Sequence, residues 1–128
     1  MEKQQLERIA TQVVDAGYRV HKELGPGLLE SVYQFCLMDE LDRRGIYAEQ
    51  EVPLPLYYRG KKLDKEYRLD ILVEEEIIIE IKAVEVVNPV YVAQIISYLR
   101  LSDLRLGFLM NFHVPVFRNG IRRYVNNF

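Results

Sequence analysis

The chain has 128 residues, a formal net charge of −2 and one cysteine, Cys36, which predicts a single domain over residues 1–128 and excludes an intramolecular disulfide. No apolar run approaches the roughly 18 residues of a membrane span, and no signal-peptide pattern follows Met1, so we expect a cytoplasmic protein outside the membrane. The slight negative charge excludes a dense basic footprint for nucleic acid, so any such contact must come from local patches.

Two helices are expected at the start of the chain. Apolar residues recur at helical spacing over residues 6–24 and predict an amphipathic helix that ends at Gly25-Pro26-Gly27. A second apolar stripe predicts a helix from about Leu28 to Arg44, which ends at Gly45 because glycine readily adopts a left-handed conformation.

Strand patterns then alternate with one further helix. Two prolines in residues 51–58 make that segment an edge strand, since proline cannot donate to a ladder. Asn88 and Pro89 are typical of the start of a helix. The other expected elements are strands over 65–73, 77–84, 105–112 and 121–125 and a helix over 89–101. The order is ααβββαββ, an α/β fold in which helices flank a small mixed sheet.

Three charged residues interrupt the two inner strands of this pattern: Asp70, Glu80 and Lys82. Burial of an unpaired charge is costly, so each needs a partner or a ligand. If the hairpin around Glu75 pairs residues whose numbers sum to 150, Asp70 lies opposite Glu80, and Lys82 shares that face. A shift by one residue would separate the carboxylates. Both faces are apolar, so only the charges favour the first register.

Two arrangements would satisfy these charges. A divalent cation such as Mg²⁺ binds one or two carboxylates together with waters and phosphate oxygens, and it lowers the pKa of an attacking water. Lys82 would then orient that water or hold a phosphate. In the alternative arrangement, Lys82 forms a salt bridge with Asp70 or Glu80 that only fixes the strand register. The residues alone leave both open.

Two helical residues are candidate neighbours of this site. Glu30 shares a helical face with Tyr33 and Leu37, at the edge of the buried stripe. There it could reach the site, or its negative charge could simply interact favourably with the helix dipole in the first turn. Gln94 lies four residues before Tyr98 in the third helix, where it could reach a ligand or form a hydrogen bond within the core.

Three short basic patches are candidates for nucleic-acid contacts: Arg43-Arg44, Lys61-Lys62 with Lys65, and Arg122-Arg123. Each patch also has a simpler interpretation as solvated charge in a loop or at a strand end, because short basic pairs are common on protein surfaces. For any one patch, the sequence favours the interpretation as solvated surface charge.

The segment Gly27-Leu28-Leu29-Glu30-Ser31-Val32-Tyr33 matches the signature of the GxxExxY proteins, and the chain resembles that family over nearly its whole length. Further matching segments are His21–Gly27, Tyr67–Asp70, Glu80–Val84, Gln94–Tyr98, Leu106-Gly107 and Asn111-Phe112. By resemblance, the family belongs to the PD-(D/E)xK nuclease-like superfamily. One departure is Leu69, which stands where the superfamily motif has proline.

The resemblance implies a restriction-endonuclease-like αβββαβ core, with an extra N-terminal helix and a short C-terminal strand. It also implies site roles. Asp70 and Glu80 would be metal ligands, Lys82 the motif lysine, Glu30 a helix carboxylate that joins the metal, and Gln94 the glutamine of a Q-x-x-x-Y helix. The implied cofactor is Mg²⁺ or Mn²⁺.

The implied activity is metal-dependent hydrolysis of phosphodiester bonds in DNA or RNA. Because a fold does not fix a function, a catalytically inactive module that binds nucleic acid or a protein partner is the alternative. A homodimer is a further expectation, formed by pairing of the edge strand near 54–58, or of the strand that ends at Val125, with a second copy.

Overall fold

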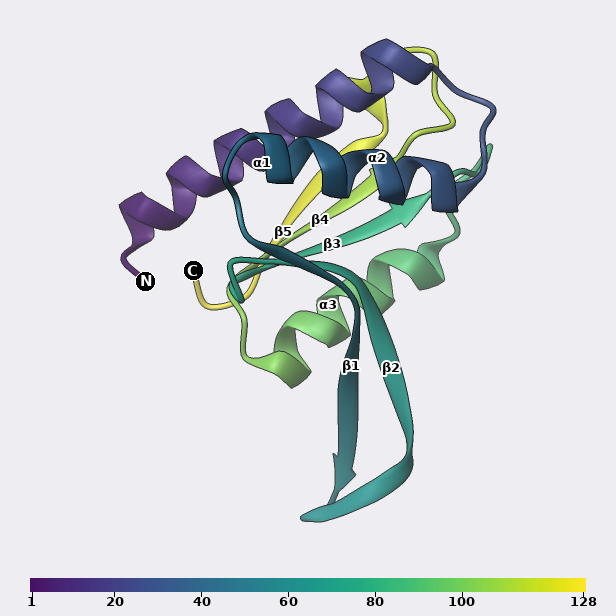
Figure 1. Ribbon diagram of the computed structural model, residues 1–128. Helices are drawn as coiled ribbons and strands as arrows, with labels where there is room; N and C mark the ends of the chain where they lie inside the picture. Colours follow the sequence, from purple (N-terminus) through teal and green to yellow (C-terminus); the bar gives the residue numbers. More distant parts are fainter.

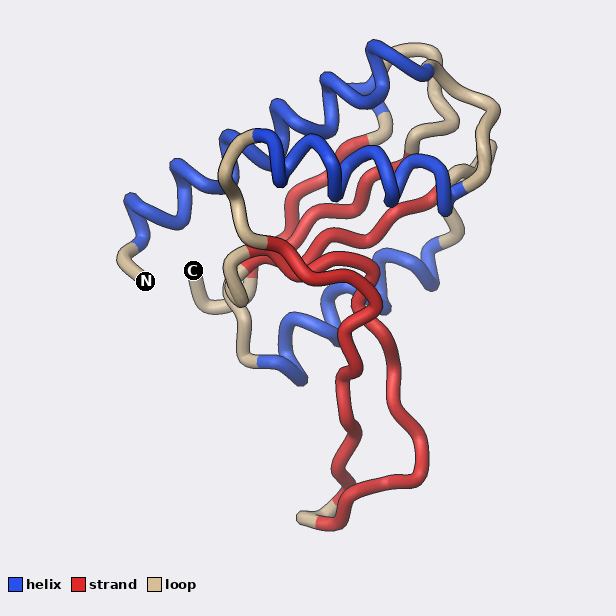
Figure 2. Tube along the Cα trace, in the orientation of Figure 1, coloured by secondary structure: helices blue, strands red, loops and turns tan.

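One mixed five-stranded sheet with helices on both faces makes up the computed structural model, which describes residues 1–128 (Figures 1 and 2). The elements in chain order are α1 (Lys3–Leu24), α2 (Glu30–Arg43), β1 (Ala48–Tyr58), β2 (Lys61–Val73), β3 (Ile77–Lys82), α3 (Pro89–Ser102), β4 (Leu106–Asn111), the 3₁₀ turn η1 (Phe117–Asn119) and β5 (Ile121–Val125). The strands lie in the order β1-β2-β3-β4-β5, and only β3 and β4 are parallel. The predicted αβββαβ core, with one added helix and one added strand, is confirmed.

Strand β3 is central and is covered on both faces. Ile77, Ile79 and Ile81 pack in one apolar cluster with α1 and α2, while Ile78 packs in a second cluster with α3. Figure 1 shows the same layers, with α1 and α2 on one side of the sheet and α3 on the other. A strand buried on both faces reads as a continuous apolar run, which explains the sequence of β3.

The ends of several elements differ from the predicted ones. Helix α2 begins at Glu30, so Leu28 and Leu29 precede it and are exposed. Strand β2 begins at Lys61, directly after the two-residue turn Arg59-Gly60. Both turn residues have positive φ angles of 51° and 81°, which are typical of a tight hairpin turn. Strand β3 ends at Lys82, two residues earlier than expected.

The start of α3 is built as predicted. The Asn88 side chain accepts a hydrogen bond of 2.9 Å from the backbone N–H of Val90, and Pro89 occupies the first helical turn. The helix ends at Ser102, and the next residue, Asp103, adopts a left-handed conformation. These caps fix the helix that covers the face of β3 on which Glu80 and Lys82 lie.

The hairpin of β1 and β2 twists sharply halfway along its length. Leu69 and Ile71 are two residues apart, yet Leu69 packs with the α3 cluster and Ile71 with the α1–α2 cluster. Between them lies Asp70, and in β1 the nearby Glu51 has a positive φ angle of 52°. Beyond this twist, the outer part of the hairpin leaves the body of the molecule (Figures 1 and 2).

Strands β1 and β5 form the two edges of the sheet, as the prolines of β1 predicted. Pairing of either edge with a second copy stays a prediction. None of the helices has the length and the apolar character that crossing a membrane requires.

The corner between α1 and α2 depends on Tyr33. Its hydroxyl donates a hydrogen bond of 2.6 Å to the carbonyl of Gly25 and accepts one of 3.1 Å from the N–H of Leu28. The ring is fully buried and stacks on Phe112, with 4.5 Å between the ring centroids. Gly27 has a φ angle of 100°, which favours glycine. The spacing from Gly27 to Tyr33 therefore describes a structural corner.

We expect Tyr33→Phe to lower the free energy of unfolding by about 1–3 kcal/mol, because two partly buried backbone groups lose their partner while the ring stack remains. Urea denaturation would measure this change. Tyr18→Phe is the matched control, since the Tyr18 hydroxyl has no hydrogen-bond partner and the side chain is partly exposed. Equal stability of the two variants would contradict the assigned role.

Candidate functional site

Asp70 and Glu80 face each other where the ladder between β2 and β3 ends. The last paired residues are Ile71 and Ile79, whose numbers sum to 150 as in the favoured register. At the next position along both strands, hydrogen bonds from backbone N–H groups to side-chain carboxylates replace the backbone-to-backbone bonds of the ladder. The N–H of Asp70 donates to Oε2 of Glu80 at 2.8 Å, and the N–H of Ile81 donates to Oδ2 of Asp70 at 2.7 Å. Each strand thus binds the other strand's carboxylate, and the predicted opposition is confirmed.

Each of these carboxylates keeps one oxygen free. Oδ1 of Asp70 and Oε1 of Glu80 have no hydrogen-bond partner in the protein, and neither is fully enclosed, since no fully buried polar side-chain atom lacks a partner. One oxygen of each group is therefore held in place by a backbone amide, while the other is open to a ligand. Hard divalent cations bind such oxygens.

Lys82 lies on the same face of β3 as Glu80, toward α3. Its ammonium nitrogen is 4.4 Å from the centre of the Tyr91 ring, a cation–π contact. Lys82 forms no ion pair, since no carboxylate oxygen lies within 4.0 Å of its ammonium nitrogen. The alternative in which Lys82 forms a salt bridge with Asp70 or Glu80 to fix the register is therefore wrong for this structure. Backbone amides bind the two carboxylates, and the Lys82 ammonium lies over the ring of Tyr91.

Burial makes both carboxylates hard to ionise. The pKa of Glu80 is raised from 4.5 to about 8, first by burial, since the residue is 7% exposed, and then by the negative charge of Asp70. The pKa of Asp70 is also raised by burial, although the Ile81 amide and the charge of Lys82 lower it in part. Burial and the nearby Glu80 raise the pKa of Tyr98 on α3 to about 12. Both carboxyl groups therefore hold a proton more tightly than they would in water, and a bound cation would favour their ionised forms.

Neither Glu30 nor Gln94 forms a hydrogen bond to this pair, whose bonds are made to backbone amides. Glu30 is exposed at the first residue of α2, three residues before the buried Tyr33, so it lies at the end of the buried stripe that its spacing predicts. The charge of Glu30 still raises the pKa of Asp70. Gln94 is half-buried on α3, and its side chain makes no hydrogen bond, so the expected bond within the core is absent.

No group of three or more His, Cys, Asp or Glu side chains is arranged to hold a metal ion. The structure brings Asp70 and Glu80 together, with Lys82 on the same face of β3 as Glu80, and it does not group Glu30 with them as a third ligand. The protein itself therefore offers two carboxylates at this point. Mg²⁺ commonly binds through one or two carboxylates and completes its shell with waters and phosphate oxygens, so the pair fits such an ion.

Helix α2 contacts the site through Gln34, which the sequence did not single out. The Gln34 amide donates to Oε1 of Glu51 at 2.9 Å and to the carbonyl of Asp70 at 3.3 Å. It connects α2 to the point where the hairpin twists. Gln34 is one helical turn after Glu30 and shares its face, which is the only signal in the sequence that points to it.

Asn111 is a second residue that sequence analysis missed. It is 2% exposed, and its amide accepts from the N–H of Val84 at 3.1 Å and donates to the carbonyl of Val84 at 2.9 Å. These bonds hold the segment that follows Lys82 and end β3 before Val84. An asparagine at the end of an apolar strand was the available signal, but its partner could not be read from it.

Two surface hollows lie near the sheet. One, of about 370 Å³, is lined by Leu28, Leu29, Glu30, Ser31 and Ala83, and it separates the start of α2 from the residue after Lys82.

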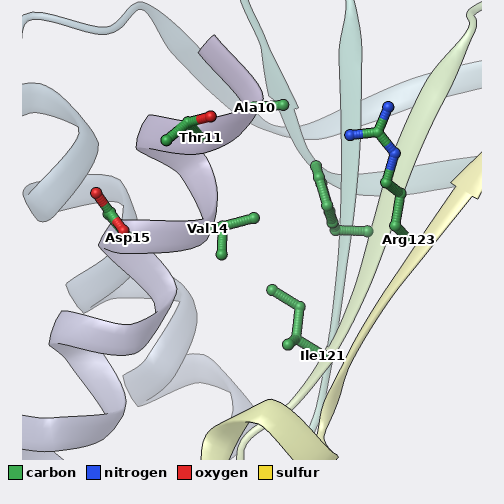
Figure 3. Close-up of a pocket in the computed structure, with 7 residues that line it drawn as sticks. Ala10, Thr11, Val14, Asp15, Ile121 and Arg123 are labelled. Carbon is green, nitrogen blue, oxygen red and sulfur yellow. The ribbon is translucent and has the colours of Figure 1, made fainter. Parts of the chain in front are cut away.

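The other hollow, of about 340 Å³, lies between α1 and the β4–β5 edge, where Val14 points toward Ile121 (Figure 3), and it is also lined by Ala10, Thr11, Asp15, Phe108 and Arg123. It includes none of the predicted site residues.

The raised pKa of Glu80 predicts how stability depends on pH. Between pH 4.5 and about 8, the folded protein holds a proton that the unfolded chain has released. The free energy of unfolding should therefore fall as the pH rises through this window, by up to about 1.4 kcal/mol per pH unit. Glu80→Gln keeps an acceptor for the Asp70 amide but cannot titrate, so its profile should be flatter.

Urea denaturation from pH 5 to 8.5 would test this expectation. Glu85→Gln is the control, because this substitution removes the same charge at an exposed position. Parallel profiles for the wild-type protein and Glu80→Gln would show that Glu80 does not hold the proton.

Comparison with known proteins agrees with this geometry. A family model described as the PD-(D/E)XK nuclease superfamily matches residues 7–124, which run from α1 to β5 and include Asp70, Glu80 and Lys82. No curated protein and no solved structure matches the chain. Nucleases of this superfamily generally use divalent metal ions. Since the match covers almost the whole sequence, the chain belongs to the PD-(D/E)XK nuclease superfamily.

Proposed function

We propose that the protein is a metal-dependent nuclease that hydrolyses phosphodiester bonds in DNA or RNA. One observation carries the proposal: Asp70 and Glu80 are fixed by reciprocal backbone hydrogen bonds, and each keeps an open oxygen beside Lys82. A structural pair of acidic residues would not need two oxygens turned away from every protein donor. The superfamily supports the same reading.

Asp70 and Glu80 would hold the metal, Mg²⁺ or Mn²⁺. When bound, such an ion lowers the pKa of a water and stabilises charge on a phosphoryl group. Glu30 is the proposed third ligand. Its support is electrostatic, since its charge already acts on Asp70. The charge that burial makes unfavourable on Glu80 gives the pair a physical reason to bind a cation.

Lys82 would act on the substrate itself. Its ammonium lies over Tyr91 and is free of carboxylates, so its hydrogens can be donated to the attacking water or to a phosphate oxygen. Gln94 would support the site from α3, because its amide has no protein partner. Asn111 and Tyr91 would position Lys82, the first through the backbone after it and the second through the ring.

We also propose that the chain belongs to the GxxExxY group and acts in the cytoplasm. The corner that Gly27 and Tyr33 build, with Glu30 between them as the first residue of α2, supports the first point. The single Cys36 supports the second, since it fits a reducing compartment.

Titration of Mn²⁺ tests the metal site before any substrate is known. Calorimetry on the wild-type protein should give one binding event, and Asp70→Asn and Glu80→Gln should each weaken it by at least about tenfold, because each removes a ligand charge. Glu85→Gln is the control, with the same loss of charge at an exposed position. Binding that is equal in all four proteins would remove the basis of the proposal.

Cleavage assays test the chemistry. A labelled oligonucleotide should be cut with Mg²⁺ or Mn²⁺ and not with a chelator. Lys82→Met should lower kcat by about 100-fold or more, because it removes a donor at the developing charge and keeps the apolar stem. Lys22→Met, an exposed lysine of α1, is the control.

Two outcomes of this assay would argue against a nuclease. Cleavage that survives in both Asp70→Asn and Lys82→Met would come from another source. Metal binding without cleavage of any DNA or RNA would favour the alternative, a nuclease-fold module that only binds nucleic acid or a protein partner.

A further inference from the structure

The outer part of the β1–β2 hairpin, residues 57–68, is a surface that the proposed site does not use. We call it the β arm. Every residue of the β arm is exposed, and the hairpin extends away from the sheet and its helices (Figures 1 and 2). No part of the chain covers it. A projecting ribbon of this kind needs a reason, since unpaired strand edges promote aggregation.

The β arm is basic in an acidic chain. It holds five cations and two carboxylates, a net charge of +3, which leaves −5 for the rest of a chain of net charge −2. The cations are Arg59, Lys61, Lys62, Lys65 and Arg68. None of them forms an ion pair. The β arm is therefore complementary in charge to a polyanion, and no carboxylate of the chain itself pairs with its cations.

The other two basic patches of the sequence differ on this point. Arg43 pairs with Asp39, Arg44 with Glu40 and Arg123 with Glu7, at 2.7–3.1 Å. Those are ordinary surface ion pairs within the chain. Only the patch on the β arm consists wholly of cations without ion-pair partners.

Tyrosines accompany the lysines on both faces of the β arm. Tyr57 lies opposite Lys62, and Tyr58 lies opposite Lys61, so each face of the tip carries one ring and one ammonium. The two rings are 61% and 66% exposed. Exposed rings beside cations form a stacking surface for unpaired bases, with the backbone phosphates held by the lysines.

The β arm is continuous with the proposed catalytic site. Tyr67 at its base contacts Tyr98 on α3, with 5.4 Å between ring centroids, and the charge of Glu80 acts on Tyr98. Along β2, Lys62 precedes Asp70 by eight residues, roughly 26 Å of extended strand. A strand bound at Asp70 and Glu80 could therefore continue along the tyrosines to the tip.

We infer that the β arm binds single-stranded nucleic acid and guides it to the site at Asp70 and Glu80. The inference rests on the proposed function, since it names the substrate class of the same site. Stacking on Tyr57 and Tyr58 requires bases that are free of a partner strand, which favours a single strand over a duplex. The positive charge of the β arm opposes pairing of this arm with the same arm of a second copy, because like charges would then face each other.

Binding measured without metal separates this inference from catalysis. Fluorescence anisotropy with a labelled 20-nucleotide single strand, in a chelator, would compare the wild-type protein with two triple variants and two tyrosine variants. In Lys61→Gln/Lys62→Gln/Lys65→Gln, the slope of log Kd against log salt concentration should fall by about 2, since about 0.7 is lost per phosphate contact on a single strand.

The matched control, Arg8→Gln/Arg118→Gln/Arg122→Gln, removes three exposed cations that also lack ion pairs and should leave the slope unchanged. Tyr57→Ala and Tyr58→Ala should each weaken binding by about tenfold, the size of a lost stacking contact. All the substituted side chains are exposed, so the variants should keep the wild-type melting temperature.

Three results would overturn the inference: equal loss of binding in the two triple variants, tighter binding of a 20-base-pair duplex than of the single strand, or a wild-type dimer that Tyr57→Ala converts to monomer with binding unchanged. The nuclease proposal fails on different evidence. Binding that depends on the β arm, without cleavage under Mg²⁺ or Mn²⁺, would keep the arm and reject the catalysis.

Discussion

The exchange of hydrogen bonds between Asp70 and Glu80 is the contact on which the rest of the site depends. Two strands that separate would leave backbone N–H groups without partners, and two buried carboxylates would lose their water. The two sets of groups satisfy each other in part, because the backbone N–H groups of Asp70 and Ile81 donate hydrogen bonds to the carboxylates of Glu80 and Asp70. What remains unsatisfied is one oxygen on each acid and the repulsion between them, which is the chemical basis of a cation site.

The sheet places this pair where three structural features meet. The ladder of β2 and β3 ends there, the hairpin twists there, and α3 covers the face that carries Glu80 and Lys82. The twist sends the outer hairpin away from the body and leaves the β arm with both faces free. The separation of charge follows from this shape, since the acidic pair is enclosed between layers while the basic arm lies in solvent.

Much of this fold was predictable because it depends on local patterns. Helical periodicity gave α1, the prolines of β1 gave the edge strand, and Asn88 gave the cap of α3. The register of β2 and β3 followed from two charges that had to meet. The start of α2, where Glu30 lies, depends on a corner that Tyr33 closes through hydrogen bonds to Gly25 and Leu28. Asn111 and Gln34 were missed because their partners lie 27 and 36 residues away in sequence.

The sequence by itself therefore determined the order of the elements, the opposition of Asp70 and Glu80, and the presence of Lys82 on their face, since strand alternation and hairpin pairing are short-range rules. The tertiary structure alone decided that Lys82 rests on Tyr91 and not on a carboxylate, that Glu30 does not join the two carboxylates as a third ligand, and which basic patch is free of ion pairs. These outcomes depend on the layer that packs over the sheet and on where the hairpin leaves it, and both are set by contacts between residues far apart in the chain.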